Sequence, residues 1–99
     1  MIRAEIIANK SAQDDMIAAL ESVIPDFWYT LIPLVYGRGH SGSKAGSPVW
    51  PEENFVLIAY LRDEQEGIVR KMVQLVKQRL MREGIKLFVM HDLVGVETD

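Results

Sequence analysis

Residues 27–36 read FWYTLIPLVY and residues 55–61 read FVLIAYL, and both stretches predict β-strands. Both are rich in aromatic and β-branched residues, which favour β-strands. Pro33 lies inside the first stretch, and a proline cannot donate a hydrogen bond to a neighbouring strand. This strand is therefore predicted to lie at a sheet edge or to contain a bulge at Pro33.

Both predicted strands are apolar on both of their faces. In the first, alternation separates Phe27, Tyr29, Leu31 and Val35 from Trp28, Ile32, Leu34 and Tyr36. In the second, it separates Phe55, Leu57 and Leu61 from Val56, Ile58 and Tyr60. Helices on one side would leave a polar face to water on the other. We therefore expect a second copy of the chain to cover this face. A water-exposed apolar face and a cover from the C-terminal tail are the alternatives.

The chain before this pair of strands predicts one strand and one helix. Residues 2–8 alternate between apolar and charged side chains, as a half-buried strand does. Apolar residues at helical spacing predict a helix over 12–24. Ser11 is expected to be its N-cap with Asp14 as the capping-box partner, and Pro25 ends it.

The chain after the pair predicts a second helix and a last strand. The helix is expected over about 64–83, with Asp63 as its N-cap, Glu66 at the capping-box position and Gly84 as its C′ residue. Residues 85–91 form the strand. The order βαββαβ predicts a ferredoxin-like α+β fold, in which both helices cover one face of a four-stranded antiparallel sheet. The 99 residues are expected to form a single domain.

Composition excludes several classes of function. Without cysteine the chain has no disulfide, no thiolate nucleophile and no cysteine-based metal site. A net charge of −3 argues against nucleic acid as a partner. No apolar run approaches the ~18 residues of a transmembrane segment. The N-terminus lacks a signal-peptide pattern, so we expect a cytoplasmic protein.

The polar loop at residues 37–54 is the expected functional segment. It reads GRGHSGSKAGSPVWPEEN and holds four of the seven glycines. It is far longer than a hairpin between neighbouring strands needs, and such loops are usually functional or disordered. Glycine N–H groups beside Arg38 and Lys44 could surround a phosphate. Simple flexibility or a protein-binding role explains the same composition.

Two side chains of this loop suggest further chemistry. His40 is a candidate metal ligand, with Glu52, Glu53 or His91 as partners, but no HExxH or similar spacing occurs and an exposed loop histidine is the alternative. His91 itself is expected to be a hydrogen-bonded residue at a strand end. Trp50 lies between two prolines as an aromatic anchor for this chain or for a partner. No catalytic pattern such as GxSxG is found, so the chain is not expected to be an enzyme.

The junction Tyr36-Gly37-Arg38-Gly39-His40 and the stretch Gly84-Ile85-Lys86-Leu87-Phe88-Val89 resemble the PII signal-transduction family. The similarity in topology covers nearly all of the chain. It implies a compact homotrimer with inward-facing sheets and a long loop, the T-loop, that contacts a target protein. It also implies that adenine nucleotides bind in clefts between subunits.

The resemblance also assigns roles to single residues. It implies that a ligand is bound by Thr30, Gly37, Arg38, Gly39 and Lys86. It implies that a partner protein is contacted by His40, Ser43, Lys44 and Trp50. The loop before the last strand is shorter than the glycine-rich phosphate loop of the family, and residues 93–97 contain no arginine. The expected ligand is therefore an adenine nucleotide or another anion.

These observations predict a non-enzymatic, trimeric regulatory protein. A ligand at the subunit cleft would change the conformation of loop 37–54, which engages a partner protein. One alternative is a metal-binding or metal-tolerance trimer of the same fold that uses His40. Another is a small enzyme with its active site at a subunit interface.

Overall fold

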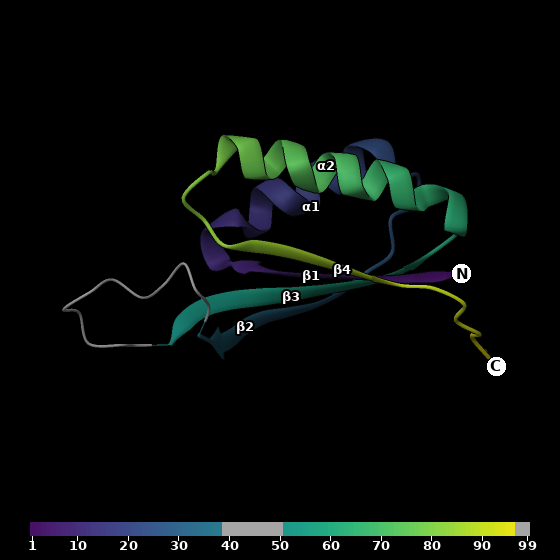
Figure 1. The fold of residues 1–99 in the computed structure, drawn as a ribbon, viewed down its shortest axis with the longest axis horizontal. Coiled ribbons are helices and arrows are strands. Elements are labelled where there is room, and N and C mark those ends of the chain that lie inside the picture. The colour runs from purple at the N-terminus through teal and green to yellow at the C-terminus, as the bar shows by residue number, and fades with distance from the viewer. Residues whose placement is uncertain (39–50, 97–99) are drawn as a thin grey trace.

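The computed structural model describes residues 1–38 and 51–96. Within them the order is β1 (Ile2–Asn9), α1 (Gln13–Val23), β2 (Thr30–Gly37), β3 (Glu52–Leu61), α2 (Glu66–Arg79) and β4 (Ile85–Met90). The strands form one antiparallel sheet in the spatial order β2-β3-β1-β4. Both helices lie on the same side of this sheet (Figure 1). The predicted ferredoxin-like βαββαβ fold is confirmed.

The core lies between the helices and one face of the sheet. Alternate residues of β1 and β3 point at the helices and are buried, as alternation along a strand requires. The helices contribute Met16, Leu20, Val69, Val73 and Val76. Ile85, Leu87 and Val89 of β4 pack against this cluster, on one side of the strand as predicted.

The strand that contains Pro33 is irregular and lies at the sheet edge, as predicted. β2 pairs only with β3, and the pairing register shifts between Ile32 and Val35. The ammonium group of Lys10 donates a hydrogen bond to the Pro33 carbonyl at 2.6 Å. A bulge at this position accommodates the proline without breaking the ladder on either side.

The register shift also exchanges the two faces at the end of β2. Val35 pairs with Asn54 on the side away from the helices, and Tyr36 pairs with Glu53 on the other side. The predicted faces of Val35 and Tyr36 are therefore wrong, because one inserted residue reverses every later side chain.

Both neighbouring strands differ from their predicted limits. β2 begins at Thr30 rather than residue 27, after Asp26 with φ of 50°. β3 begins at Glu52, so Gly37 and Glu52 are a paired end of the ladder. The predicted loop 37–54 is thus too long at both ends. The first residues of β3 are polar, so strand propensity did not predict that the strand begins there.

Each helix is preceded by a 3-10 turn, which overturns both predicted N-caps. The side chain of Asn9 accepts a hydrogen bond from the Ser11 amide at 3.0 Å. Ser11 is therefore a hydrogen-bond donor here and not the N-cap of the helix. The Gln65 side chain likewise accepts from the Arg62 amide at 2.9 Å. Asp63 binds the N-terminal amine instead. A local turn competes with capping for the same backbone groups.

The second helix is shorter than predicted. α2 ends at Arg79, with Leu80 as its C-cap, so Gly84 is not its C′ residue. The Gly84 carbonyl accepts from the Asn9 amide at 3.0 Å and joins the start of β4 to the end of β1. β4 ends at Met90, one residue before His91.

The side of the sheet away from the helices is called the open face. Strand register places on it Arg3, Glu5, Ile7, Thr30, Ile32, Val35, Asn54, Val56, Ile58, Tyr60, Lys86, Phe88 and Met90. The predicted second apolar face is therefore present, and Tyr60 and Phe88 are 55% and 48% exposed. Val94 and Val96 are themselves exposed, so these two residues of the C-terminal tail do not bury their side chains there.

Candidate functional site

A pocket of about 440 Å³ lies at the end of the sheet where β2 and β3 meet the segment 39–50. We call it the loop-end pocket. It is lined by Ile7, Ala8, Gly37, Arg38, Glu52, Asn54, Lys77, Gly84, Ile85, Lys86 and Phe88. The Asn9–Gly84 hydrogen bond and the Gly37–Glu52 pair fix the strand ends around it.

Cations dominate the polar lining of the pocket. Arg38 lies just after β2, Lys86 on β4 and Lys77 on the last turns of α2. The Lys77 ammonium group already donates to the carbonyls of Met81 and Glu83, so it closes the turn after α2. Among residues 1–38 and 51–96, neither Arg38 nor Lys86 forms an ion pair. These two cations can therefore meet an anion.

Gly37 is a position where the backbone needs a small residue. A Cβ atom at Gly37 would lie 3.0 Å from the side-chain nitrogen of Asn54. The absence of a side chain lets the Asn54 amide lie beside the end of β2. Its NH2 group is a further donor at the pocket.

The structure brings together three of the five predicted ligand-binding residues. Gly37, Arg38 and Lys86 line the loop-end pocket. Thr30 does not line it, because it pairs with Ile58 near the other end of β2. Gly39 lies outside the described residues, as do all of the predicted partner-binding residues, His40, Ser43, Lys44 and Trp50.

Sequence reasoning missed Asn54 and Lys77 as pocket residues. Asn54 falls in the predicted loop 37–54, but in the structure it belongs to β3 and pairs with Val35 beyond the bulge. Lys77 lies in the predicted helix 64–83, where nothing in the local pattern marks it as a pocket residue. Its side chain reaches the pocket because of where α2 ends and how β4 then pairs with β1. Local sequence patterns do not show either of these.

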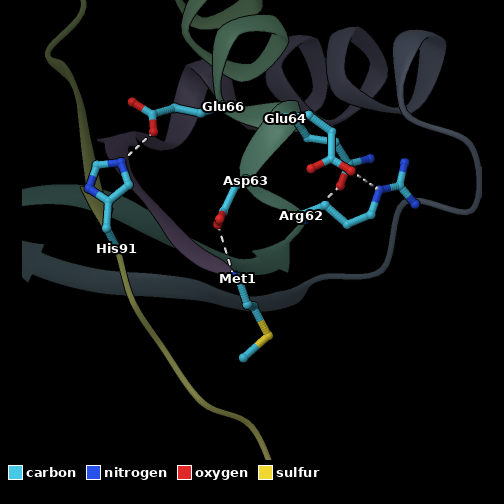
Figure 2. A network of polar contacts seen from close by, with 7 residues as sticks. Met1, Arg62, Asp63, Glu64, Glu66 and His91 are labelled. Atoms are coloured by element: carbon cyan, nitrogen blue, oxygen red, sulfur yellow. Dashed lines mark hydrogen bonds and ion pairs between the residues drawn. The ribbon is translucent and has the colours of Figure 1, made fainter.

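A larger pocket of about 750 Å³ lies at the opposite end of the sheet, near both termini. Its charged groups are largely paired with one another (Figure 2). The N-terminal amine lies 2.9 Å from Asp63, and Arg62 lies 3.0 Å from Glu64. Because these ion pairs already satisfy its charges, this end offers less for a charged ligand than the loop-end pocket.

Figure 2 also shows a polar contact between the end of β4 and the start of α2. His91 Nε2 hydrogen-bonds to Glu66, which also binds Arg70 at 2.7 Å. The bond from His91, and then that from Arg70, lower the pKa of Glu66 below its ordinary value of 4.5. The prediction of a hydrogen-bonded histidine at the strand end is confirmed.

The metal alternative finds no group of ligands in the described part of the chain. Residues 1–38 and 51–96 contain no set of three or more His, Asp or Glu side chains that could hold a metal ion. His40 lies outside these residues, so its role stays a prediction. No helix in the described ranges has the length and apolar character needed to cross a membrane.

Comparison with known proteins identifies the fold. No protein-family model and no curated protein sequence matches the chain. Among solved structures, it is similar to CPII, a nitrogen regulatory PII-like protein from Thiomonas intermedia K12 bound to ADP, AMP and bicarbonate. The TM-score is 0.71 at 18% identity, over 98% of this chain and 94% of CPII.

A second solved structure matches equally well over the chain length. This is a DUF3240 family protein from Shewanella baltica OS155, with a TM-score of 0.68 at 12% identity. The match covers 99% of this chain and 96% of that protein. The chain therefore has the fold of PII-like proteins over its whole described length.

Proposed function

We propose that this chain is a divergent PII-like regulatory protein that binds a small anion or nucleotide phosphate in the loop-end pocket. The observation that supports this most strongly is the convergence of Gly37, Arg38 and Lys86 beside the segment 39–50. CPII, which shares the fold, is bound to ADP, AMP and bicarbonate. An adenine nucleotide or bicarbonate is therefore the first ligand to test here.

The chemistry of the pocket suits an anion with limited charge. Arg38 offers a planar guanidinium group, and Lys86 a flexible ammonium group. Glu52 places one carboxylate in the same lining, which opposes a ligand that carries several negative charges on that side. A volume of about 440 Å³ falls in the range of small-molecule sites.

Self-association is the second part of the proposal. Ile7 and Phe88 belong both to the open face and to the loop-end pocket. A second copy that covers the open face would therefore border the pocket and could complete it. We propose that a homotrimer of single-domain chains achieves this, and that Thr30 contributes from its end of β2.

Signalling through the segment that follows Arg38 is the third part. We propose that ligand binding changes the conformation of this segment, which presents His40, Ser43, Lys44 and Trp50 to a partner protein. This requires the ligand to bind one conformation of the segment more tightly than another. The role is regulatory rather than enzymatic, and the expected compartment is the cytoplasm.

Calorimetric titration tests the ligand site. We expect at least one of ADP, ATP, AMP, bicarbonate and inorganic phosphate to bind. We expect Arg38→Ala and Lys86→Ala each to weaken binding by about tenfold or more, as loss of a charge-assisted contact does. The matched controls are Arg62→Ala and Lys71→Ala, which remove the same charges away from the pocket. Absence of binding by the whole panel, or equal losses in the controls, would contradict the proposed site.

The metal alternative has its own test. Titration with divalent zinc, copper and nickel should show no binding that His40→Ala removes. A metal affinity that falls in the His40→Ala protein would favour the metal-binding trimer over the anion-binding regulator.

A further inference from the structure

An ion pair lies among apolar residues of the open face. Arg3 and Glu5 are on β1, a central strand of the sheet, and their charged groups are 2.8 Å apart. The same guanidinium donates to the Tyr60 hydroxyl at 3.0 Å and lies 5.9 Å from the Tyr60 ring centre. Strand register surrounds the pair with Ile58, Phe88 and Met90.

The hydrogen-bonding capacity of this pair is only partly used. The Arg3 Nε group is buried and finds no acceptor in residues 1–38 and 51–96. In the same ranges, the ion pair and hydrogen bond of Glu5 involve only Oε2. The two side chains are partly shielded, with 29% of the Arg3 side chain and 22% of the Glu5 side chain exposed. A second copy cannot reach the covered Nε, but Glu5 Oε1 is left for a further donor, and native structures usually satisfy such a group where it is shielded from water.

We propose that Arg3 and Glu5 direct self-association of the open face, with Arg3 of one copy bound to Glu5 of a second copy. This inference rests on the self-association included in the proposed function. It adds the residues that select the partner and set its register.

A second copy fits this surface for two reasons. The pair contains one cation and one anion, so two identical faces offer each other both a donor and an acceptor. The surrounding residues are apolar on both copies and can pack on one another. A foreign apolar surface would cover the charges without binding them, which is strongly unfavourable. A single polar pair in an apolar interface can set register in this way.

Mixing charge-reversed chains tests the proposal by sedimentation velocity. Arg3→Glu leaves a chain with two acidic groups at this place, and Glu5→Arg leaves one with two basic groups. We expect each alone to raise the dissociation constant of the assembly by about tenfold or more. Mixing the two variants should restore assembly in part, into particles that contain both chains, because two of the three contacts in a mixed trimer join opposite charges. The double variant Arg3→Glu/Glu5→Arg should assemble like the original protein.

The mixture separates contacts between copies from the contact within one copy. Within either single variant the two groups repel each other, so only pairing between chains can explain rescue by mixing. The matched control reverses the charges of Arg62 and Glu64, an ion pair whose residues are also two positions apart in the chain but are not on the open face. This control should leave assembly unchanged. No rescue in the mixture, or single variants that assemble normally, would overturn the inference while self-association stands.

Two further outcomes complete the test. A monomeric original protein at micromolar concentration would overturn both this inference and the proposed self-association. If a charge-reversed chain fails to fold by circular dichroism, the neutral variants Arg3→Gln and Glu5→Gln replace it. Each should weaken assembly severalfold, and Arg62→Gln should not. If the Arg3→Gln, Glu5→Gln and Arg62→Gln proteins all assemble equally well, the inference is overturned.

Discussion

The two faces of the sheet have similar apolar residues and very different surroundings. On β3, Leu57 points at the helices and is fully buried, whereas Tyr60 points away and is 55% exposed. Figure 1 shows both helices on one side of the sheet and no described element on the other. The chain's own core therefore uses only the apolar residues on one side of these strands.

The two faces also differ in how they treat charge. Among the described residues, the helix-covered core contains no buried polar or charged side chain. The open face contains the Arg3–Glu5 pair and, at its loop end, Lys86. A core needs only apolar packing, whereas a surface that selects a partner also needs polar groups at defined positions. Charge thus distinguishes the open face from the core.

The largest expected effect comes from the covered face. Leu57→Ala should lower the free energy of unfolding by about 2–5 kcal/mol, because it leaves a cavity beneath the helices. This loss, measured by urea denaturation, should be the same at all protein concentrations. Ile58→Ala, its neighbour on the open face, should cost less, and its cost should rise with protein concentration. Equal and concentration-independent losses would remove the difference between the faces.

The next effect concerns the open face itself. Phe88→Asp should raise the dissociation constant of the assembly by about tenfold or more, because a carboxylate would be buried against an apolar partner. Light scattering measures the assembly, and circular dichroism should show a retained fold. The control is Leu75→Asp, which changes a residue of similar exposure on α2. A Phe88→Asp protein that assembles normally would indicate that this face meets only water.

A smaller effect tests the bulge that exchanges the faces of β2. Lys10→Met removes the hydrogen bond to the Pro33 carbonyl and should cost about 1 kcal/mol in the free energy of unfolding. Hydrogen exchange should become faster at the amides of residues 34–36 and stay unchanged in β1. Unchanged exchange in β2 would mean that the bulge holds without Lys10.

The smallest effect concerns the polar link between the helix layer and the sheet. Because the pKa of Glu66 is lower in the folded protein than in the unfolded chain, its carboxylate stabilises the fold at pH values above about 4.5, its pKa in the unfolded chain. This stabilisation is lost as the pH falls through the pKa of Glu66 in the folded protein. Glu66→Gln should therefore be less stable than the original protein at pH above 4.5, and the difference should shrink in more acidic solution. Urea denaturation over this pH range measures it. A difference that grows on acidification would contradict the assignment.

Most of the fold could be predicted because periodicity reports directly on burial. The alternation in β1 and the helical spacing in α1 and α2 each gave the correct element. Pro33 correctly indicated an edge strand with a bulge. The limits of the elements were less predictable, because Ser11 and Asp63 have the chemistry of N-caps but are used in other contacts.

The site could be predicted only in part. The family resemblance predicted that Gly37, Arg38 and Lys86 belong to one site, and all three line the loop-end pocket. Asn54 and Lys77 reach the same pocket through a shifted register and the end of a helix. Such contacts join residues far apart in the chain and leave no local pattern.

The order of the elements and the presence of two apolar sheet faces could be derived from the sequence, because both follow from the period of apolar residues along each strand and helix. Packing of the folded chain sets which side chains share a face beyond the bulge and which cations share a pocket. It also brings Arg3 and Glu5 together as one pair among apolar neighbours. These outcomes depend on strand register, which is set by pairing between distant segments rather than by any one of them.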